Sequence, residues 1–495
     1  MTDINKTKCY LTADLTAVIF LTAAAVCAML FYSDSTTPLG NNLFKYFDQS
    51  IFCLIGKNWA EGNVPYITEW DTKGPLVFFF NMLGYKLCSN STHGVFCIQT
   101  LNFCATVTAG YYLLRHSLGR KRTVFFLFVY IAAWCTVSSG GNQSGEWCML
   151  PATTAFLLAG KYTTRADIHL YKYHPAAYSF FYGIFGGACL LTRASDFFPM
   201  AVFVICIAAA IALRGNIRNL LANAAAFLSG LFIITLPFAV YFYINDAFHE
   251  LAYTLFKYNF EYMRSSDISE LYSHIKPAYF FIWFSSLFAA AMLGTAALTE
   301  KGQRITGVIW TAVSISTLTW LLFSFGNANY AVSWLPLLLL APLSAAACRQ
   351  EKGFARKCRT ITIIETALVA VGFINYLRVL PQQKMSNNGR ESLCEAAIAR
   401  KIPHATSFVA YNCSPAVYIL TGHKPAYRYC FGSQDWAIEC GPSAKAEIMN
   451  TFAEGQASMI LIRDFEKSYI RDILLKRYKL ILNDKKNNIK LFKLK

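Results

Sequence analysis

The sequence predicts a polytopic α-helical membrane protein, with about eleven transmembrane helices, further helices at the membrane interface and a small C-terminal α/β soluble domain. Two observations carry this prediction. Of the 495 residues, 55% are hydrophobic and only 15% are charged, whereas a typical soluble domain has about 25% charged residues. Several apolar runs reach the roughly 18–20 residues that a helix needs to cross a bilayer, and the end of the chain lacks such runs.

The apolar runs define the candidate membrane spans. No small-residue cleavage site follows the first run, so we expect an uncleaved span there rather than a signal peptide. The predicted spans are 11–31, 95–114, 123–139, 147–160, 176–192, 197–213, 220–244, 278–298, 305–325, 329–347 and 360–380.

The apolar stretch 74–88 is expected to lie along the membrane rather than to cross it. At about 1.5 Å per residue it is about 22 Å long, which is short of the roughly 30 Å hydrocarbon core. If it does not span, basic loops such as "RHSLGRKR" at 115–122 fall on one side of the membrane with the N-terminus. The positive-inside rule then places that side in the cytoplasm, and places loops 32–94 and 245–277 outside.

The net charge of +17 does not indicate a nucleic-acid partner. The basic residues collect in short loops between apolar runs, which is typical of membrane topology. We therefore expect membrane lipids, and no nucleic acid, among the partners of this chain.

The last part of the chain is expected to form a separate domain. The sequence predicts a transmembrane domain over 1–380, with the outer loop 32–94, and an outer α/β domain over 381–495. Helical patterns occur around 390–401, 414–421, 443–454 and 466–476, and they alternate with the strand-like runs "TSFVAY", "AYRYCF", "SMILIR", "YKLILN" and "IKLFKL". Disulfides and free buried thiols are both open for Cys394, Cys413, Cys430 and Cys440.

The outer loop carries unusual charges in "FDQSIFCLIGKNWAEGNVPYITEWDTKGPL" at 47–76. Asp48 begins an amphipathic helix, where it is either a helix cap or a functional acid. Pro75 suits the first turn of a second helix. Lys73 stands before that helix, where it either completes an anion site or extends towards lipid headgroups.

Other charged residues lie at the ends of predicted spans or within them. Glu146 is the only charge of "SSGGNQSGEWCML", so it is either exposed at the interface or faces a partner or site. Arg193 could pair with Asp196 or contact a lipid phosphate. Asp14 and Glu365 lie within apolar runs near their inner ends, which favours an interfacial position over a proton relay.

These motifs resemble the GT-C superfamily of membrane glycosyltransferases. The similarity is to its bacterial branch, related to protein O-mannosyltransferases and aminoarabinose transferases and similar to glycosyltransferase family 39. It rests on Asp48 after the first span, then "GNVPY" and "WDTKGPL", "SGE" in the second outer loop, "NANYAVSWLP" late in the membrane part, and "SPAVYILTGHKPAYRY" in the C-terminal segment.

The resemblance implies an inverting transfer of a sugar from a polyprenyl-phosphate donor to a lipid, glycan or protein acceptor. The reaction would take place on the periplasmic face of the bacterial inner membrane. Asp48 would be the general base that deprotonates the acceptor, and Lys73 would bind the donor phosphate, with Arg193 as a weaker phosphate ligand. The residues expected to orient substrate are Asp71, Glu146, Tyr66 and Tyr330.

Two features qualify what the resemblance implies. Gln49 and Ser50 follow Asp48, where many relatives have a second acid or a nearby arginine, and this leaves the acceptor class open. Metal use varies across the superfamily: two or three acids could hold a divalent cation, but no spacing here requires one.

Two hypotheses compete with the enzyme. One is a polytopic transporter or flippase for a lipid-linked saccharide, which would show internal repeats and polar residues near the bilayer midplane. The other is a non-catalytic assembly or sensor protein, whose charges would not concentrate in the loop at 47–76. The sequence has no visible repeat and gathers its charges at one face, which favours the transferase.

Overall fold

The computed structural model describes residues 3–33, 47–88, 92–138, 141–164, 171–259, 289–300, 303–323, 328–348, 352–384, 388–440 and 442–495. The chain forms two compact units. The first unit contains 1–32, 99–238 and 267–381, and the second contains 33–98, 239–266 and 382–495. The predicted domain boundary near 381 stays a prediction, because residues 382–495 form a unit together with two earlier segments.

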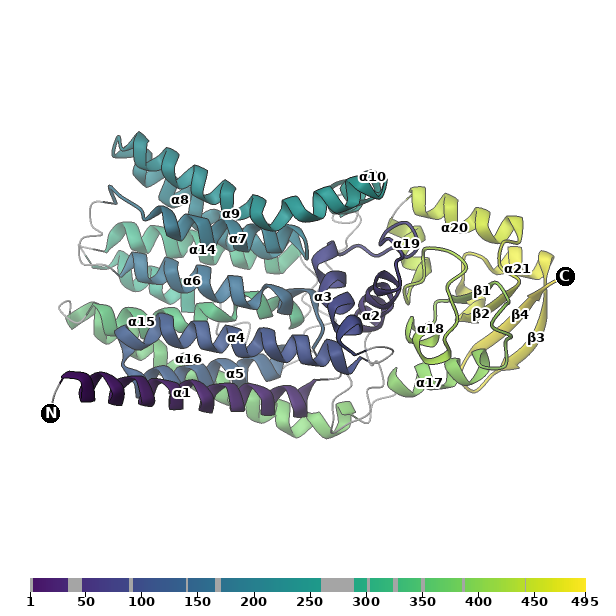
Figure 1. Ribbon diagram of the computed structural model, residues 1–495, viewed down its shortest axis with the longest axis horizontal. Coiled ribbons are helices and arrows are strands. Elements are labelled where there is room, and N and C mark those ends of the chain that lie inside the picture. The colour runs from purple at the N-terminus through teal and green to yellow at the C-terminus, as the bar shows by residue number, and fades with distance from the viewer. Residues whose placement is uncertain are drawn as a thin grey trace. The chain divides into compact units, whose positions relative to one another are not determined.

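The first unit is a set of helices that run side by side (Figure 1). Short 3-10 helices, η1 (Ser144–Cys148) and η3 (Ala194–Phe197), join some of them. The principal elements are α1 (Asp3–Tyr32), α4 (His93–Leu118), α5 (Arg120–Val137), α6 (Met149–Thr163), α7 (Ala176–Leu190), α8 (Phe198–Leu213), α9 (Ile217–Ile244), α14 (Arg304–Phe323), the 3-10 helix η6 (Ala328–Leu339), α15 (Leu340–Ala347) and α16 (Lys352–Lys384).

Four segments of the described chain are long and apolar enough to cross a membrane. They are Thr12–Tyr32, Ala194–Leu213, Ile217–Ile244 and Lys352–Val379. Most other predicted spans coincide with helices that are shorter or less apolar, and residues 278–288 of the predicted span 278–298 lie outside the described residues. The chain is therefore mostly helical with several apolar spans, as predicted, while the number eleven stays a prediction.

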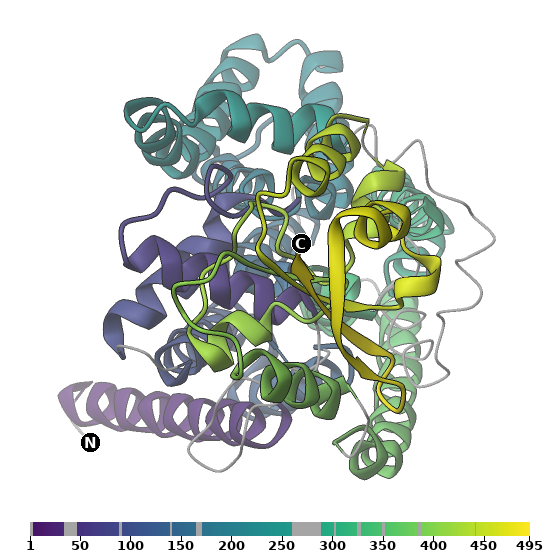
Figure 2. The same cartoon turned by 90° about the vertical axis from the view of Figure 1, so that its right-hand side faces the viewer.

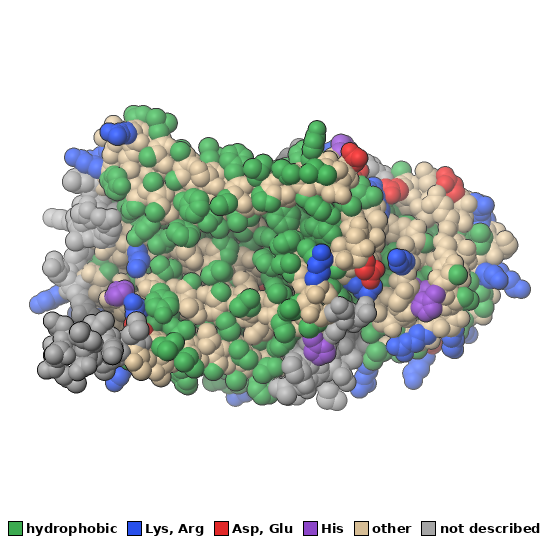
Figure 3. Space-filling model, in the orientation of Figure 1, with side chains coloured by type: hydrophobic (Ala, Val, Ile, Leu, Met, Phe, Trp, Pro, Cys, Tyr) green, Lys and Arg blue, Asp and Glu red, His purple; other side chains and the backbone are tan. Residues whose placement is uncertain are grey.

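The surface of the first unit has the character expected of a membrane protein. Large apolar side chains such as Ile19, Ile205 and Phe232 are more than half exposed. Hydrophobic side chains cover most of the visible face over these helices, and Lys and Arg gather at the end on the left of Figure 3. Such a surface is stable in a bilayer, because exposing apolar side chains to lipid does not cost the free energy that exposing them to water does.

Glycines set the distance between α7 and α9. A Cβ on Gly187 would lie 2.9 Å from the carbonyl oxygen of Leu231, and a Cβ on Gly183 or Gly230 would overlap backbone atoms of the facing helix. Small residues let helix backbones approach closely, which is how membrane helices gain packing energy without a hydrophobic driving force between them.

The second unit begins with two short helices, α2 (Phe47–Ala60) and α3 (Pro75–Leu87). They pack closely because a Cβ on Gly56 would lie 2.8 Å from backbone atoms of Asn81 and Met82. As predicted, α3 starts at Pro75, and its 13 residues span only about 20 Å. Both helices are therefore too short to cross the hydrocarbon core.

The C-terminal segment adds a four-stranded sheet to the second unit. Its strands are β1 (Phe408–Tyr411), β2 (Met459–Arg463), β3 (Tyr478–Asp484) and β4 (Ile489–Leu494), in the order β1-β2-β4-β3. β1 and β2 are parallel, and the other two pairs are antiparallel. Figure 2 shows the yellow β3–β4 hairpin near the C-terminus. The helices are α17 (Asn388–Ala399), α18 (Ala416–Thr421), α19 (Gln434–Cys440), α20 (Pro442–Glu454) and α21 (Arg471–Arg477).

The structure answers two questions about this segment: whether 426–431 forms a strand and whether its cysteines are free. The run "AYRYCF" at 426–431 is not a strand, because its aromatic side chains pack into other parts of the unit instead of alternating across a sheet. Cys394, Cys413 and Cys430 are free thiols. The side chain of Cys440 lies outside the described residues.

Candidate functional site

The loop between α2 and α3 is shaped by a buried carboxylate, Glu69. Its two oxygens accept hydrogen bonds from Asn58 Nδ2 and Thr68 Oγ1, each at 2.6 Å. The backbone of Tyr66 has a positive φ of 71°, and its N–H donates to the Glu69 carbonyl at 2.7 Å. Burial raises the pKa of Glu69, and its hydrogen-bond donors oppose that rise. Glu69 therefore supports the loop, a role that the sequence did not indicate.

Three of the predicted site residues, Asp48, Asp71 and Lys73, come together at this loop. Asp48 lies in the first turn of α2, and Lys73 precedes the N-terminus of α3. The backbone N–H of Lys73 donates to Asp71 Oδ1 at 2.9 Å. Burial raises the pKa of Asp71; the Lys73 charge lowers it and the Asp48 charge raises it. The three charged groups therefore lie close enough to interact electrostatically, and we call them the loop cluster.

Lys73 is held by its neighbours in the loop. Its Nζ lies 3.0 Å from Thr72 Oγ1, and Asn259 Nδ2 donates to the Thr72 carbonyl at 3.2 Å. The Lys73 side chain is half-buried. Its ammonium group can therefore contact a ligand while the aliphatic part of the side chain stays packed. The cluster thus presents a cation beside the N-terminus of α3, where the helix dipole also favours an anion.

Tyr66 contacts the backbone of Lys73. Its side chain is fully buried, and its hydroxyl donates to the Lys73 carbonyl at 2.8 Å. Its ring packs against Phe78 and Phe242, with centroids 5.8 and 5.5 Å away. The Tyr66 hydroxyl thus holds the backbone of Lys73, and the role of Tyr66 in orienting substrate stays a prediction.

Trp70 and Arg428 link the loop to the C-terminal segment, and neither was predicted. The backbone N–H of Trp70 donates to the Arg428 carbonyl at 2.8 Å. Arg428 in turn donates to Glu250 at 2.8 Å and to Glu447 at 2.6 Å. Trp70 is buried, and its indole N–H donates to Thr254 at 3.0 Å. Three distant stretches of the chain therefore fix the loop that carries the cluster.

Replacing Arg428 with Met is expected to loosen this loop. The substitution removes two charge-assisted hydrogen bonds from half-buried groups, so the free energy of unfolding should fall by about 1–3 kcal/mol. Thermal unfolding of the purified protein in lipid nanodiscs measures the change. Arg471→Met is the control, because Arg471 is exposed and its ion pairs are exposed too. Equal shifts for the two variants would contradict this role of Arg428.

Glu146 belongs to the first unit and is buried rather than exposed. Only 4% of it is accessible, so the alternative of simple exposure at the interface is wrong. Gln99 Nε2 donates to its Oε2 at 3.2 Å, and Asn102 Nδ2 donates to its carbonyl at 2.8 Å. The carboxyl lines a small cavity of about 10 Å³, together with side chains that include Trp134 and Trp147. Burial raises its pKa to about 8.

Stability is expected to depend on pH through Glu146. Its pKa rises from an ordinary value of 4.5 to about 8 on folding, so the folded state binds more protons than the unfolded state between these two values. The free energy of unfolding should therefore fall as pH rises through this window, by at most about 1.4 kcal/mol per unit. Thermal unfolding of wild type and Glu146→Gln, between about pH 5 and pH 8, should show a flatter profile for the variant.

The control for this pH profile is Glu61→Gln. Glu61 is exposed and pairs with Lys57 on the surface of α2, so its removal should leave the wild-type slope unchanged. An identical slope for wild type and Glu146→Gln would show that Glu146 titrates near its ordinary pKa in the folded protein.

Arg193 pairs with Asp196, one of the two alternatives that the sequence left open. Arg193 Nε donates to Asp196 Oδ1 at 2.6 Å, and 11% of the Arg193 side chain is exposed. Trp334 Nε1 donates to the Asp196 carbonyl at 3.4 Å, which joins η3 to η6. Binding of phosphate by Arg193 stays a prediction. Tyr330 lies in η6, and its side chain is outside the described residues.

The predicted residues are thus divided between the two units. Asp48, Asp71, Lys73 and Tyr66 belong to the second unit, whereas Glu146 and Arg193 belong to the first. Among the described side chains, no group of three His, Cys, Asp or Glu is placed to hold a metal ion.

Comparison with solved structures identifies the fold. ArnT from Cupriavidus metallidurans bound to undecaprenyl phosphate matches with a TM-score of 0.55 and 12% sequence identity, over 97% of this chain and 97% of that chain. The apo state of the same protein matches with a TM-score of 0.52 and 11% identity, over 98% of each chain. An oligosaccharyltransferase of Archaeoglobus fulgidus, with zinc and sulfate, matches with a TM-score of 0.47 and 11% identity, over 93% of this chain and 71% of that chain.

Comparisons of sequence add no relative. No protein-family model matches the chain, and no curated protein matches it. The likeness to ArnT therefore shows the fold of this chain, and the predicted resemblance is confirmed for the fold alone. With its apolar helices, this fold makes the chain a multi-pass membrane protein.

Proposed function

We propose that this chain is an integral-membrane glycosyltransferase that moves a sugar, with inversion, from a polyprenyl-phosphate donor to a lipid, glycan or protein acceptor. The observation that carries the proposal is the loop cluster, where an acid, a lysine and a helix N-terminus meet. The fold supports it, because ArnT with this fold has been crystallised with undecaprenyl phosphate.

The reaction follows from the chemistry of the cluster. Asp48 accepts the proton of the acceptor hydroxyl, whose oxygen then attacks the anomeric carbon of the donor. The bond from that carbon to the phosphate oxygen breaks, and polyprenyl phosphate leaves with the bonding electrons. Lys73 and the N–H groups at the start of α3 stabilise the negative charge that grows on the phosphate. Attack from the side opposite the leaving group inverts the anomeric configuration.

The other candidates have supporting roles in this proposal. Asp71 is buried and holds the backbone of Lys73, so it orients the phosphate ligand. Glu146 and Arg193 orient the substrates, and Arg193 is the weaker phosphate ligand. A divalent cation is compatible with this chemistry but is not required by it.

The proposed topology places the chemistry outside the cytoplasm. About eleven spans, a cytoplasmic N-terminus and an outer domain at 381–495 put the loop cluster on the periplasmic face of a bacterial inner membrane. The basic loops at 115–122 and 214–219 support this orientation, since both lie on the predicted inner side.

The test is a comparison of intact cells that lack this chain with cells in which it has been restored. Glycolipids, glycoproteins and surface polysaccharide are profiled by mass spectrometry, and membranes are assayed for release of polyprenyl phosphate from a radiolabelled sugar donor. We expect one sugar modification to disappear and to return with the restored chain. If all three classes stay the same and no sugar is transferred in membranes, the proposal fails. Donor movement across sealed vesicles without release of polyprenyl phosphate would instead support the flippase.

A further inference from the structure

Two buried thiols of the first unit, Cys148 and Cys189, lie next to each other. Cys148 ends η1, and Cys189 lies in the last turn of α7, 41 residues further along the chain. Neither side chain is exposed. The Cys189 thiol donates to the Cys148 sulfur, and the two sulfurs are 3.9 Å apart. Both are free thiols in this structure, and the proposed transfer reaction uses neither.

Thr192 holds the Cys148 side of this pair. The Thr192 Oγ1 atom lies 3.0 Å from Cys148 Sγ and donates its own proton to the Ala188 carbonyl at 2.9 Å. Since the hydroxyl proton is already used, the Cys148 thiol is the donor in its contact with Thr192. The thiols therefore form a hydrogen-bonded chain from Cys189 through Cys148 to Thr192, which keeps the two sulfurs next to each other.

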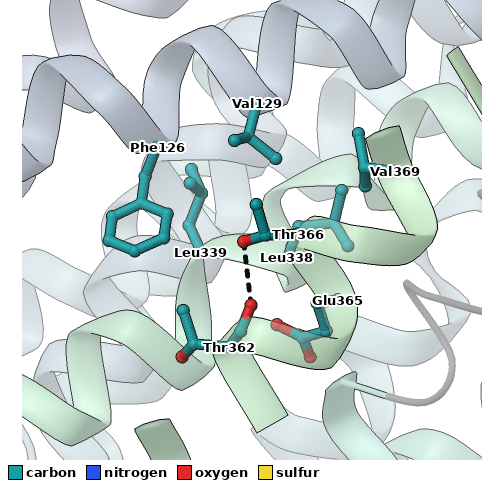
Figure 4. Close-up of a pocket in the computed structure, with 8 residues that line it drawn as sticks. All are labelled: Phe126, Val129, Leu338, Leu339, Thr362, Glu365, Thr366 and Val369. Atoms are coloured by element: carbon teal, nitrogen blue, oxygen red, sulfur yellow. Dashed lines mark hydrogen bonds between the residues drawn. The ribbon is translucent and has the colours of Figure 1, made fainter. Parts of the chain in front are cut away.

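Two small cavities of the first unit have no room for a ligand larger than water. One lies beside Glu146 and the other beside Glu365 of α16, which Figure 4 shows, and each encloses about 10 Å³. Glu365 lies six residues after Arg359, in the part of α16 that follows its basic start. The contact between Cys148 and Cys189 needs no cavity, because its two reactive groups are already neighbours.

The predicted topology puts the two thiols at the outer face of the membrane. Cys148 directly precedes α6, and Cys189 is one residue from the end of α7. The predicted spans 147–160 and 176–192 have these two ends outside, on the side opposite the basic loops. Disulfides form and persist in the bacterial periplasm, whereas cytosolic thiols are kept reduced.

We propose that Cys148 and Cys189 are joined by a disulfide in the cell, an inference that rests on the topology given with the proposed function. The oxidant is a protein disulfide of a periplasmic thiol–disulfide oxidoreductase. One cysteine thiolate attacks a sulfur of that disulfide and forms a mixed disulfide, and the second thiolate then displaces the oxidant. Two electrons pass to the oxidant, which leaves as a dithiol, and the two protons that the cysteines lose end on its sulfurs.

The bond requires only a small movement of the side chains. A disulfide has its sulfurs about 2.05 Å apart, so each sulfur must move by about 1 Å, which rotation about its Cα–Cβ bond can supply. Because neither thiol is exposed in the folded unit, the exchange takes place while the helices assemble. Burial then protects the disulfide from reductants. The bond ties η1, which carries Glu146, to the end of α7 that leads to Arg193.

The number of free thiols in intact cells tests the proposal. Cells that make the full-length protein are quenched in trichloroacetic acid, dissolved in SDS and labelled with maleimide–polyethylene glycol, so that each free thiol adds one mass tag. Cys148→Ala should carry one tag more than wild type, because Cys189 loses its partner and becomes free. Cys189→Ala should also carry one tag more. If the two thiols are free in the cell, each variant instead carries one tag fewer than wild type, and the proposal is overturned.

Cys358→Ala is the matched control. Cys358 is a buried free thiol on the predicted inner side of the membrane, so its removal should cost one tag. Mass spectrometry of unreduced wild type should also show the peptides of Cys148 and Cys189 joined, and a different partner for either cysteine would overturn the proposal. Neither measurement involves sugar transfer. Free thiols would therefore remove the disulfide and leave the proposed transferase standing, and loss of the transferase would leave the disulfide.

Discussion

Substitution of Asp48 by Asn is expected to abolish sugar transfer while the donor still binds. The amide has nearly the same shape but cannot accept the proton of the acceptor hydroxyl. General-base catalysis contributes about 10²–10⁴-fold, so kcat should fall by at least about 100-fold. The donor should bind with equal or greater affinity, because the substitution removes a negative charge near the site proposed for its phosphate.

The measurement is release of polyprenyl phosphate by the purified protein, together with a separate titration of donor binding. Glu61→Gln is the matched control, since Glu61 follows the same helix and pairs on the surface with Lys57; its kcat should stay at the wild-type level. A kcat for Asp48→Asn within a few-fold of wild type would remove Asp48 as the base. A weaker donor affinity with unchanged kcat would instead place Asp48 in donor binding.

Substitution of Lys73 by Gln is expected to weaken donor binding and to slow the reaction. The ammonium meets the phosphate in the bound donor, and the negative charge on that phosphate grows as the glycosidic bond breaks. A charge-assisted hydrogen bond is worth about 1.5–3 kcal/mol, so donor affinity should fall by about 10- to 100-fold, and kcat should fall as well. Lys73→Arg should restore part of the binding, because it keeps the positive charge on a side chain of different shape.

Titration of the donor and of free polyprenyl phosphate against the variants measures this effect. Lys57→Gln is the control, because it removes a lysine from the same unit whose ammonium lies 2.5 Å from Glu61. Donor affinity that is unchanged in Lys73→Gln would show that the phosphate lies elsewhere, and Arg193 would then be the next candidate.

The parts of the site that the sequence predicted are those governed by local rules. Pro75 has no backbone N–H to lose at a helix start, so the beginning of α3 could be placed to the residue. Asp48 in the first turn of α2 follows from the same kind of local pattern. The pair of Arg193 and Asp196 has a spacing of three residues, which side chains bridge readily.

The parts that the sequence did not predict depend on contacts between distant residues. The backbone hydrogen bond between Trp70 and Arg428 joins positions more than 350 residues apart. Neither a tryptophan nor an arginine in the sequence indicates such a contact. The stretch 426–431 reads as a strand, but packing of Tyr429 and Phe431 against Trp70 decides its conformation. Burial of Glu146 could not be foreseen either, because the residues that cover it come from several helices.

The backbone hydrogen bond between Trp70 and Arg428 has a consequence for chimeric proteins. Exchanging only the C-terminal segment with that of another transferase would replace Arg428 and Glu447. Trp70 and Glu250 would remain, but they would lose their hydrogen bonds to Arg428. Such a hybrid is expected to insert normally in the membrane and still misplace Lys73, the proposed phosphate ligand. The loop at 61–74, the short helix Phe248–Ala252 and the stretch 425–447 should therefore be exchanged together, both in laboratory recombination and in natural gene exchange.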